Sequence, residues 1–168
     1  MHVRPEAAAD APAIFAVHAA AFPTDAEARL VDRLRSRADG YLGFVAEVGD
    51  EVVGHVVFSP VSVVDPDYPH RGLGLAPVGV LPAHQRRGIG GALIREGLAA
   101  CRSAGWPFVV VLGHSEYYPR FGFRRAGDVG LWDEYDGGDA FMVIELMPGG
   151  LPSDGGLVKY GPDFAEWS

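Results

Sequence analysis

The chain has 168 residues, of which 48% are hydrophobic and 21% charged, a composition typical of one globular domain and too apolar for a disordered chain. Its formal net charge of -8 argues against a nucleic-acid partner, because proteins that bind phosphate backbones need a basic face. No stretch approaches the roughly 20 apolar residues that cross a bilayer, and the N-terminal residues lack the basic and then apolar order of a signal peptide, so we expect a cytoplasmic protein without a membrane partner.

The N-terminal part of the sequence predicts a short strand and two helices. The strand lies near residues 2–4, and Asp10 then has the position of a cap for a helix that runs to about residue 20. Thr24 and Glu27 have the Thr-x-x-Glu spacing of a capping box, which predicts a second helix that ends near Arg35. The side chains expected to face the core from this second helix are Leu30, Val31 and Leu34.

A β-hairpin is predicted next. Residues 43–48 and 52–59 are rich in Val and Phe, and they flank a turn made of Gly49 and Asp50. Gly54 lies inside the second strand, where a glycine often marks a β-bulge.

A strand, a helix and a further strand follow the hairpin. Residues 65–74 contain two prolines and two glycines and are expected to form a turn before a strand at 75–81. From about residue 88 to 104, apolar residues recur at spacings of three and four, and residues 108–112 form an all-apolar run that is typical of a buried strand. The apolar face of the helix consists of Ile89, Leu93, Ile94, Gly97, Leu98 and Cys101, and the thiol of Cys101, the one cysteine, is expected to be buried and unreactive. Such a unit makes a parallel pair through a right-handed crossover, so the hairpin and this unit together predict a mixed sheet.

The C-terminal part predicts one more strand, at residues 140–146. The remainder, residues 148–168, is rich in Gly and Pro but contains Tyr160, Phe164 and Trp167, which we expect to dock it on the body of the protein. The chain has no internal repeat and no long linker, so residues 1–168 are expected to form a single domain with residues 148–168 as a docked tail.

The segment most informative about function is the glycine-bearing turn between the predicted strand at 75–81 and the long helix. The first amides of a helix have no partners within the helix and lie at the positive end of its dipole, so they attract an anion. Glycines leave the backbone open to a phosphate, and arginines add donors and charge. The residues that supply these features are Arg86, Arg87, Gly88, Gly90 and Gly91.

Three classes of phosphate site can be compared with this turn. A nucleotide-hydrolase loop needs Gly-Lys-Ser/Thr, and no lysine followed by Ser or Thr occurs in the chain. The dinucleotide fingerprint is half met, because Leu93 stands where the third glycine belongs and residues 112–114 offer no carboxylate for a ribose. A coenzyme A turn is left. The histidines and the cysteine show neither the HExxH motif nor paired-cysteine spacing, so no metal site is expected.

Two separated motifs resemble one family. The run QRRGIGG at residues 85–91 resembles the (Gln/Arg)-x-x-Gly-x-(Gly/Ala) signature of the GNAT superfamily of N-acetyltransferases, and YYPRFGF at residues 117–123 resembles that family's Tyr-x-x-x-Gly-Phe ending. The openings RPEAAADAPAI at 4–14 and FPTDAEARLVDRL at 22–34 resemble the bacterial YhbS-like subgroup. The resemblance implies a single-domain α/β (α+β) fold, in which helices flank a mixed, mostly antiparallel sheet with a central splayed parallel pair.

The resemblance also implies a cofactor site and a mechanism. An amine of a small-molecule acceptor attacks the thioester of acetyl-CoA, or of another acyl-CoA, directly in a ternary complex. The backbone amide of Val80 polarises the thioester carbonyl, and Tyr118 protonates the departing thiolate. A phenol has a pKa near 10, above the value near 8.5 of a thiol, so Tyr118 stays protonated until it is needed. The positions that the resemblance assigns to the coenzyme are Val78, Gly79, Val80, Gln85, Arg86, Arg87, Gly88, Ile89, Gly90, Gly91, Tyr118 and Phe121. A purely structural role for Tyr118, packing the end of the sheet, is the alternative.

The general base and the acceptor site are less well defined by the sequence. The strand at 75–81 lacks the glutamate that some family members place there, and His114 is a candidate that could equally be a helix cap or a solvated surface group. The resemblance puts Phe22, Asp25 and Glu27 at the border of the acceptor site, although the capping box already gives Glu27 a structural role.

Two other functions remain open at this point. The chain could be a non-catalytic acyl-CoA-binding sensor or partner module, which the missing base glutamate favours. It could also be an acyltransferase whose donor is carried on an acyl-carrier protein, although Arg86 and Arg87 favour free coenzyme. The sequence leaves homodimer formation open.

Overall fold

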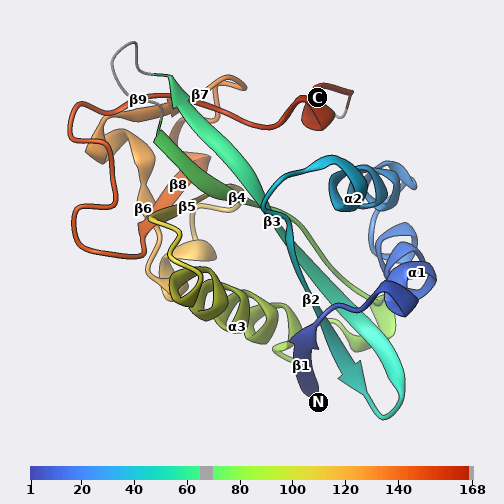
Figure 1. The fold of residues 1–168 in the computed structure, drawn as a ribbon. Helices are drawn as coiled ribbons and strands as arrows, with labels where there is room; N and C mark the ends of the chain where they lie inside the picture. The colour runs from blue at the N-terminus through green and yellow to red at the C-terminus, as the bar shows by residue number, and fades with distance from the viewer. Residues whose placement is uncertain (65–69, 167–168) are drawn as a thin grey trace.

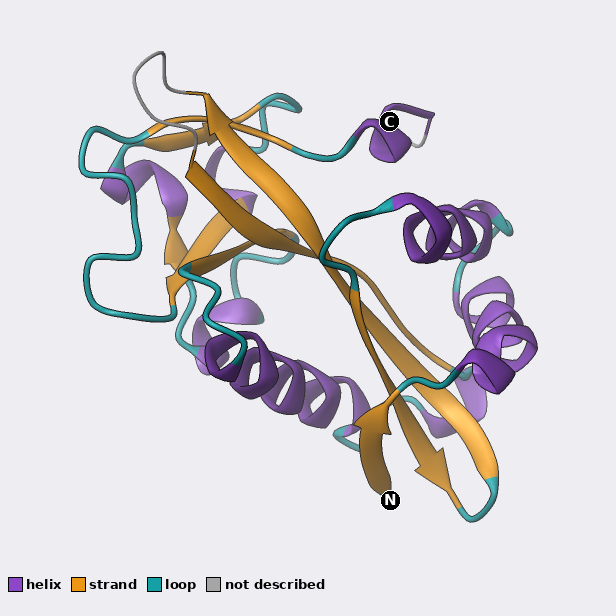
Figure 2. Cartoon of the chain, viewed as in Figure 1, coloured by secondary structure: helices purple, strands orange, loops and turns teal. Residues whose placement is uncertain are grey.

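The computed structural model describes residues 1–64 and 70–166, which form one mixed sheet with helices packed against it (Figure 1, Figure 2). The strands are β1 His2–Pro5, β2 Leu42–Val48, β3 Glu51–Val64, β4 His70–Val80, β5 Phe108–Leu112, β6 Arg124–Arg125, β7 Leu131–Asp133, β8 Phe141–Glu145 and β9 Gly156–Lys159. The α-helices are α1 Ala11–Ala21, α2 Ala26–Arg37 and α3 Ile89–Ser103. Short 3-10 helices are η1 Ala8–Asp10, η2 Pro82–His84, η3 Tyr118–Phe121, η4 Ala126–Val129, η5 Gly138–Ala140 and η6 Pro162–Glu166.

The sheet confirms the expected topology. Its strand order is β1-β2-β3-β4-β5-β8-β6, and β9 pairs with both β3 and β7. Paired strands are antiparallel except β4 with β5 and β7 with β9. Strand β3 is 14 residues long and pairs with β2, β4 and β9, so it links the two ends of the sheet.

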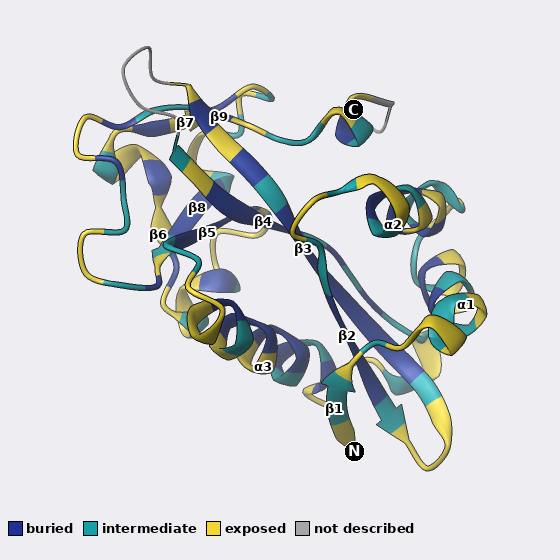
Figure 3. Ribbon diagram, in the orientation of Figure 1, coloured by how far each residue is buried: buried dark blue, intermediate teal, exposed yellow. Residues whose placement is uncertain are grey.

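The helices cover opposite faces of the sheet because side chains alternate along β2 and β3. Phe58 packs with the apolar face of α3, whereas its neighbour Val57 packs with α1 and α2. Gly97 of α3 allows the close approach, since the ring of Phe58 occupies the space that a Cβ would need. Buried residues accordingly line the sheet and the inner side of α3 (Figure 3). Cys101 lies in this core as expected, and burial raises the pKa of its thiol to about 12.

The hairpin, the bulge and the long helix follow the predictions. Strands β2 and β3 pair antiparallel around a turn that contains Gly49. Their register shifts between Ala46, which faces Gly54, and Glu47, which faces Val52, so an extra residue of β3 lies directly beside Gly54.

The predicted starts of the first two helices need correction. Asp10 has the N-cap position of α1, but its carboxylate accepts hydrogen bonds from the Ala7 amide and from Arg4 instead of capping the helix. The capping box of Thr24 and Glu27 is wrong: the N-cap of α2 is Asp25, one residue later, and Thr24 Oγ1 accepts a bond from the Ala26 amide at 3.2 Å.

The turn predicted at residues 65–74 is also wrong in its second half, because β4 begins at His70. The glycines that suggested a turn are strand residues that leave room for aromatic rings. The ring of Phe108 fills the place of a Cβ at Gly72, and Tyr160 lies 2.9 Å from the place of a Cβ at Gly74. Residues 65–69 lie outside the described part of the chain.

The C-terminal segment contributes a strand that the sequence did not predict. Strand β9 pairs with β3 and β7. Strands β6, of two residues, and β7, of three, were not predicted either, because so short a segment shows no alternation of apolar residues. Tyr160 and Phe164 pack against each other with ring centroids 5.3 Å apart, and Phe164 is buried. Trp167 lies outside the described residues.

Candidate functional site

Strands β4 and β5 separate soon after they meet. They are paired only at Leu73 with Val109 and at Gly74 with Val110. A bulge follows in β4, where Ala76 and Pro77 together face one residue of β3. The parallel pair is therefore splayed, and among the described residues no strand pairs with the edge of β4 beyond Leu75 on the side of β5.

The backbone groups on this open edge can be assigned from the pairing on the other side. The Leu81 amide points to β3, because it donates to the Val53 carbonyl oxygen at 2.8 Å. Successive residues of a strand point their amides to opposite sides. The amides of Val78 and Val80 therefore point to the open edge, and the Val80 carbonyl, which accepts from Gln85 Nε2 at 3.0 Å, does the same.

A cavity of about 770 Å³ occupies the gap between β4 and β5. Its lining comes from β4, from the loop before α3, from the end of β5 with the turn after it, and from the C-terminal end of α1. The lining residues are Phe22, Leu75, Ala76, Pro77, Val78, Gln85, Arg86, Leu112, Gly113, His114, Tyr117 and Tyr118. None of them is acidic, so the negative charge of the protein is not concentrated here.

The N-terminus of α3 adjoins this gap and is open to an anion. Its N-cap, Gly88, has a left-handed backbone with φ of 81°, and no side chain caps the helix. Arg86 also has a positive φ, of 63°, a conformation that is strained for a non-glycine residue and that gathers at functional sites. The loop is fixed to β4 by the bond from Gln85 to Val80, so the first amides of α3 are presented on a supported turn.

A second cavity, of about 390 Å³, lies in front of these amides. Its residues include Gly88, Ile89, Gly90 and Gly91 of the turn together with Arg86, Arg95 and Arg120. The guanidinium of Arg95 lies 4.9 Å from the ring centroid of Phe121, and that of Arg120 lies 4.4 Å from the ring centroid of Tyr117. Three cationic groups therefore surround a helix N-terminus in a protein of net charge -8.

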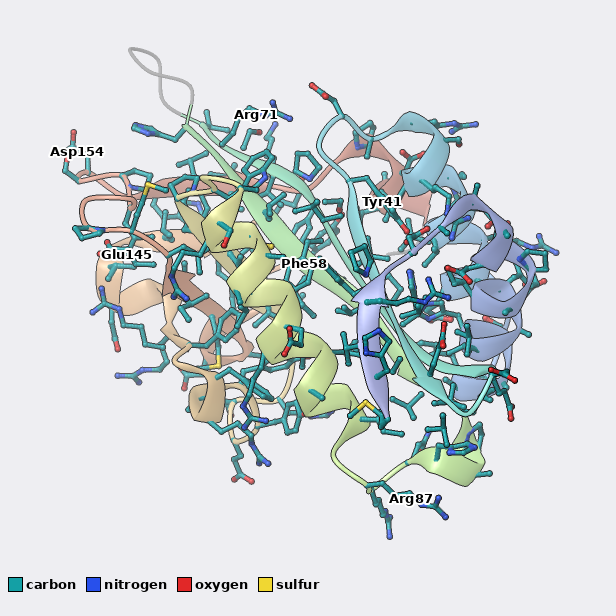
Figure 4. All side chains as sticks on the ribbon, turned by 60° about the horizontal axis from the view of Figure 1, so that its bottom comes forward. Tyr41, Phe58, Arg71, Arg87, Glu145 and Asp154 are labelled. Atoms are coloured by element: carbon teal, nitrogen blue, oxygen red, sulfur yellow. The ribbon has the colours of Figure 1, made fainter. Side chains whose placement is uncertain are left out.

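Arg86 and Arg87 differ in their relation to these cavities. Arg86 lines both, whereas Arg87 lines neither and points outward from the loop before α3 (Figure 4). Neither arginine has an ion pair within the described part of the chain.

The two cavities adjoin each other, because Gln85, Arg86 and Tyr117 line both of them. Together they form a path from the N-terminus of α3 along the open edge of β4 to Tyr118. Tyr118 begins η3, is buried, and packs its ring in the space that a Cβ at Gly113 would need. Burial, and then the neighbouring Tyr117, raise the pKa of Tyr118 to about 12, so its hydroxyl stays protonated at neutral pH.

The residues suggested for the acceptor site lie apart from one another. Phe22 and His114 both line the wider cavity, and His114 is exposed there. Asp25 lies at the start of α2, 44% exposed, in an ion pair of 3.0 Å with Arg29. Glu27 follows in the first turn of α2, and neither carboxylate is among the lining residues of the two cavities.

Several residues of this region were not found from the sequence. Arg95 belongs to no motif, although helical periodicity puts it one turn after Gly91 and could have indicated it. Arg120 occupies a variable position of the run at residues 117–123, and so the motif did not single it out. The buried pair His18 and His55 was also missed: His55 is the cross-strand partner of Gly79, and His18 packs from α1 onto that same glycine.

The described residues have neither a metal-binding cluster nor a helix that could span a membrane. They contain no group of three or more His, Cys, Asp or Glu side chains placed to hold a metal ion. Their helices are all too short or too polar to cross a bilayer.

Comparisons with known proteins agree with this architecture. The family model described as an acetyltransferase (GNAT) domain matches residues 2–126, well over half of the chain. The chain is 38% identical over 168 residues to a protein of Escherichia coli K12 named as the uncharacterized N-acetyltransferase YhbS, and the match covers 98% of each chain.

Two solved structures are similar over nearly their whole length. A crystal structure of the GNAT family N-acetyltransferase YhbS from Escherichia coli in complex with CoA has a TM-score of 0.90 and 36% identity, covering 99% of this chain and 93% of that one. A GNAT family acetyltransferase from Brucella melitensis in complex with acetyl-CoA has a TM-score of 0.76 and 38% identity, covering 97% of both.

Proposed function

This chain belongs to the GNAT family of acetyltransferases, and we propose that it transfers an acetyl group from acetyl-CoA to an amine of a small molecule, by direct attack within a ternary complex. The observation that carries the proposal is the pair of adjoining cavities that lead from the α3 N-terminus to Tyr118, because they place an anion site beside a largely apolar slot along the open edge of β4. The family and the coenzyme complexes of the two similar structures support it.

The residues along the path fit the chemistry of the coenzyme. The amides at the start of α3 suit a pyrophosphate, since Gly88 and Gly90 leave them uncovered. Arg86, Arg95 and Arg120 provide charge-assisted hydrogen bonds for phosphate oxygens in the same cavity. These three arginines favour free coenzyme over a donor carried on a protein, because a carrier-bound pantetheine lacks the nucleotide end.

The open edge of β4 suits the pantetheine arm, which carries amide groups like those of a peptide. Val78 and Val80 offer their backbone amides there, so the arm can pair as an added strand. The Val78 amide, in the wider cavity with Tyr118, can donate to the thioester oxygen as negative charge develops on it, whereas Val80, the residue expected from the sequence, lines the narrower cavity at the phosphate end. Gln85 occupies the Val80 carbonyl and leaves the amide as the available group.

Tyr118 is the proposed general acid. Its phenol lies in the slot where the thiolate departs, and its raised pKa of about 12 keeps the proton in place until the thiolate forms. The acceptor enters the same cavity between Phe22 and His114. Because the lining is largely apolar and carries no carboxylate, we propose an acceptor whose amine is attached to an apolar body rather than a polycation.

A binding measurement and an activity measurement test the proposal in sequence. Saturation with acetyl-CoA at 100 times its dissociation constant should stabilise the protein by about 2.7 kcal/mol, and desulfo-CoA should act similarly because it retains the phosphates. A panel of amines with thiol detection should then show release of CoA that depends on one class of amine. Absence of the thermal shift would contradict the site, and a shift without thiol release from any amine would favour the non-catalytic sensor.

A further inference from the structure

A buried row of three side chains runs from the end of β1 to β4. Glu6 Oε1 lies 2.8 Å from His55 Nε2, and His55 Nδ1 lies 2.9 Å from His18 Nε2. Both imidazoles are fully buried. His55 faces Gly79 across the pair of β3 and β4, and a Cβ on Gly79 would lie 2.8 Å from His18 Nδ1. The row therefore ends against the strand whose other edge is open.

The directions of its hydrogen bonds follow from the charge on Glu6. Burial would raise the pKa of Glu6, but hydrogen bonds from His55, Tyr41 and Arg35 outweigh it and lower that pKa to about 2. An ionised carboxylate only accepts, so His55 Nε2 must donate to it. Burial lowers the pKa of His55, and burial, together with the neighbouring His55 and Arg35, lowers that of His18 to about 3. Both rings are thus neutral, His55 Nδ1 accepts, and His18 Nε2 donates.

This order of donors leaves a lone pair on His18 Nδ1. That atom is buried and has no hydrogen-bond partner among the described residues. The ring of Phe22 stacks on His18 with centroids 6.0 Å apart and planes at 10°, and Phe22 also lines the wider cavity. Phe22 is therefore in contact both with the ring of His18 and with that cavity.

We infer that His18, held by His55 and Glu6, accepts the proton that the acceptor amine loses during transfer, an inference that rests on the acetyl transfer proposed above. The amine nitrogen forms the C–N bond, and the C–S bond breaks with its electron pair on sulfur, which takes the proton of Tyr118. The ammonium proton moves to His18 Nδ1 once Phe22 is displaced. The Nε2 proton of His18 can then pass to His55 and that of His55 to Glu6, so positive charge is neutralised at the carboxylate. The relay then reverses, His18 Nδ1 releases its proton to water and Tyr118 takes one up, so that both rings regain their starting tautomers and the enzyme is restored.

The assignment of protons gives a test that needs no turnover. NMR of protein labelled with ¹⁵N-histidine reports which ring nitrogen carries the proton. At neutral pH we expect His18 Nδ1 to be bare and His18 Nε2 protonated, in the free protein and with CoA bound. A proton on His18 Nδ1 would reverse the row and overturn the inference, whatever the activity.

Kinetics with the best amine of the panel give the second test. His18→Ala should lower kcat roughly 10²-fold or more, with the dissociation constant of acetyl-CoA changed by less than about twofold. His18→Gln keeps a polar amide in the core and should lower kcat by a similar factor. This variant provides the test if His18→Ala does not fold. Glu6→Gln should lower kcat less and shift the acid limb of the pH profile of kcat/KM. Besides Glu6 itself, the titratable groups that face the row and contribute to this profile are Asp10, Arg35 and Tyr41.

Two control variants separate chemistry from folding. Ile14→Val loosens α1 one turn before His18, and His2→Gln removes an exposed histidine of β1. Both should keep kcat and the pH profile, although Ile14→Val lowers the melting temperature. If His18→Ala or His18→Gln loses no more activity than Ile14→Val, the inference is wrong while the proposed transfer stands. If wild-type protein neither binds acetyl-CoA nor releases thiol, the proposed transfer fails instead, and the inference that rests on it is withdrawn too.

Discussion

Replacement of Gly90 by alanine should separate the stability of the protein from its affinity for coenzyme. Gly90 lies in the first turn of α3, and a Cβ there would meet Tyr117 Oη at 3.7 Å and Val80 Cγ2 at 4.0 Å, which are ordinary contacts. Alanine is favoured over glycine in helices by up to about 1 kcal/mol. In a chain of this length that corresponds to a rise in melting temperature of about 2–4 °C.

The same methyl group enters the narrower cavity in front of the helix amides. Loss of one charge-assisted hydrogen bond to a phosphate oxygen costs about 1.5–3 kcal/mol, so the dissociation constant of acetyl-CoA should rise about 10- to 150-fold. Isothermal titration calorimetry measures this constant, and differential scanning calorimetry measures the stability of the free protein.

Gly97→Ala is the matched control on the same helix. The ring of Phe58 occupies the place of its Cβ, so this change should destabilise the protein by about 1–3 kcal/mol and leave the affinity intact. If Gly90→Ala binds acetyl-CoA as tightly as the wild type, the phosphates do not lie at the start of α3 and the reasoning about this turn is refuted.

Three further outcomes are expected. Tyr118→Phe should lower kcat roughly 10²-fold or more with little change in coenzyme affinity, and equal rates of thiol release would remove the hydroxyl from the mechanism. Arg95→Ala should weaken acetyl-CoA binding about tenfold at low salt and less at high salt, whereas Arg124→Ala on β6 should not, as titrations at two ionic strengths would reveal. The free energy of unfolding should fall on acidification, because the pKa values of His18 and Glu6 are lower in the folded protein than in the unfolded chain. The loss due to His18 begins below about pH 6.5, and the loss due to Glu6 runs from about pH 4.5 towards 2. Urea unfolding against pH checks this, and Glu6→Gln should flatten the lower of the two windows.

The sequence predicted those parts of the fold that depend on local patterns. Helix α3 follows from apolar residues at spacings of three and four, and the β2–β3 hairpin follows from two β-rich runs around Gly49. The prediction of a turn in the first half of β4 was wrong because Gly72 makes room for the ring of Phe108. Such a tertiary contact leaves no local sequence pattern.

The candidate site also has one part that the sequence predicts and one part that it does not. The turn from Gln85 to Gly91 is continuous in sequence, so its motif was visible before the structure. Glu6, His18 and His55 come from three elements and meet only because β1, β2 and β3 pair in one register and α1 packs on their face. Such a row could not be predicted from spacing along the chain.

Strand β3 has a consequence for motion in this protein. Strand β3 runs unbroken from the half of the sheet that packs against α1 and α2 to the half that contains β9. A hinge between those halves would have to break the hydrogen bonds between β3 and β4. We therefore expect ligand binding and release to involve movement of β5 and of the turn before η3 instead. Amide hydrogen exchange should therefore be slow along β3 in both states and change on binding mainly in residues 112–118.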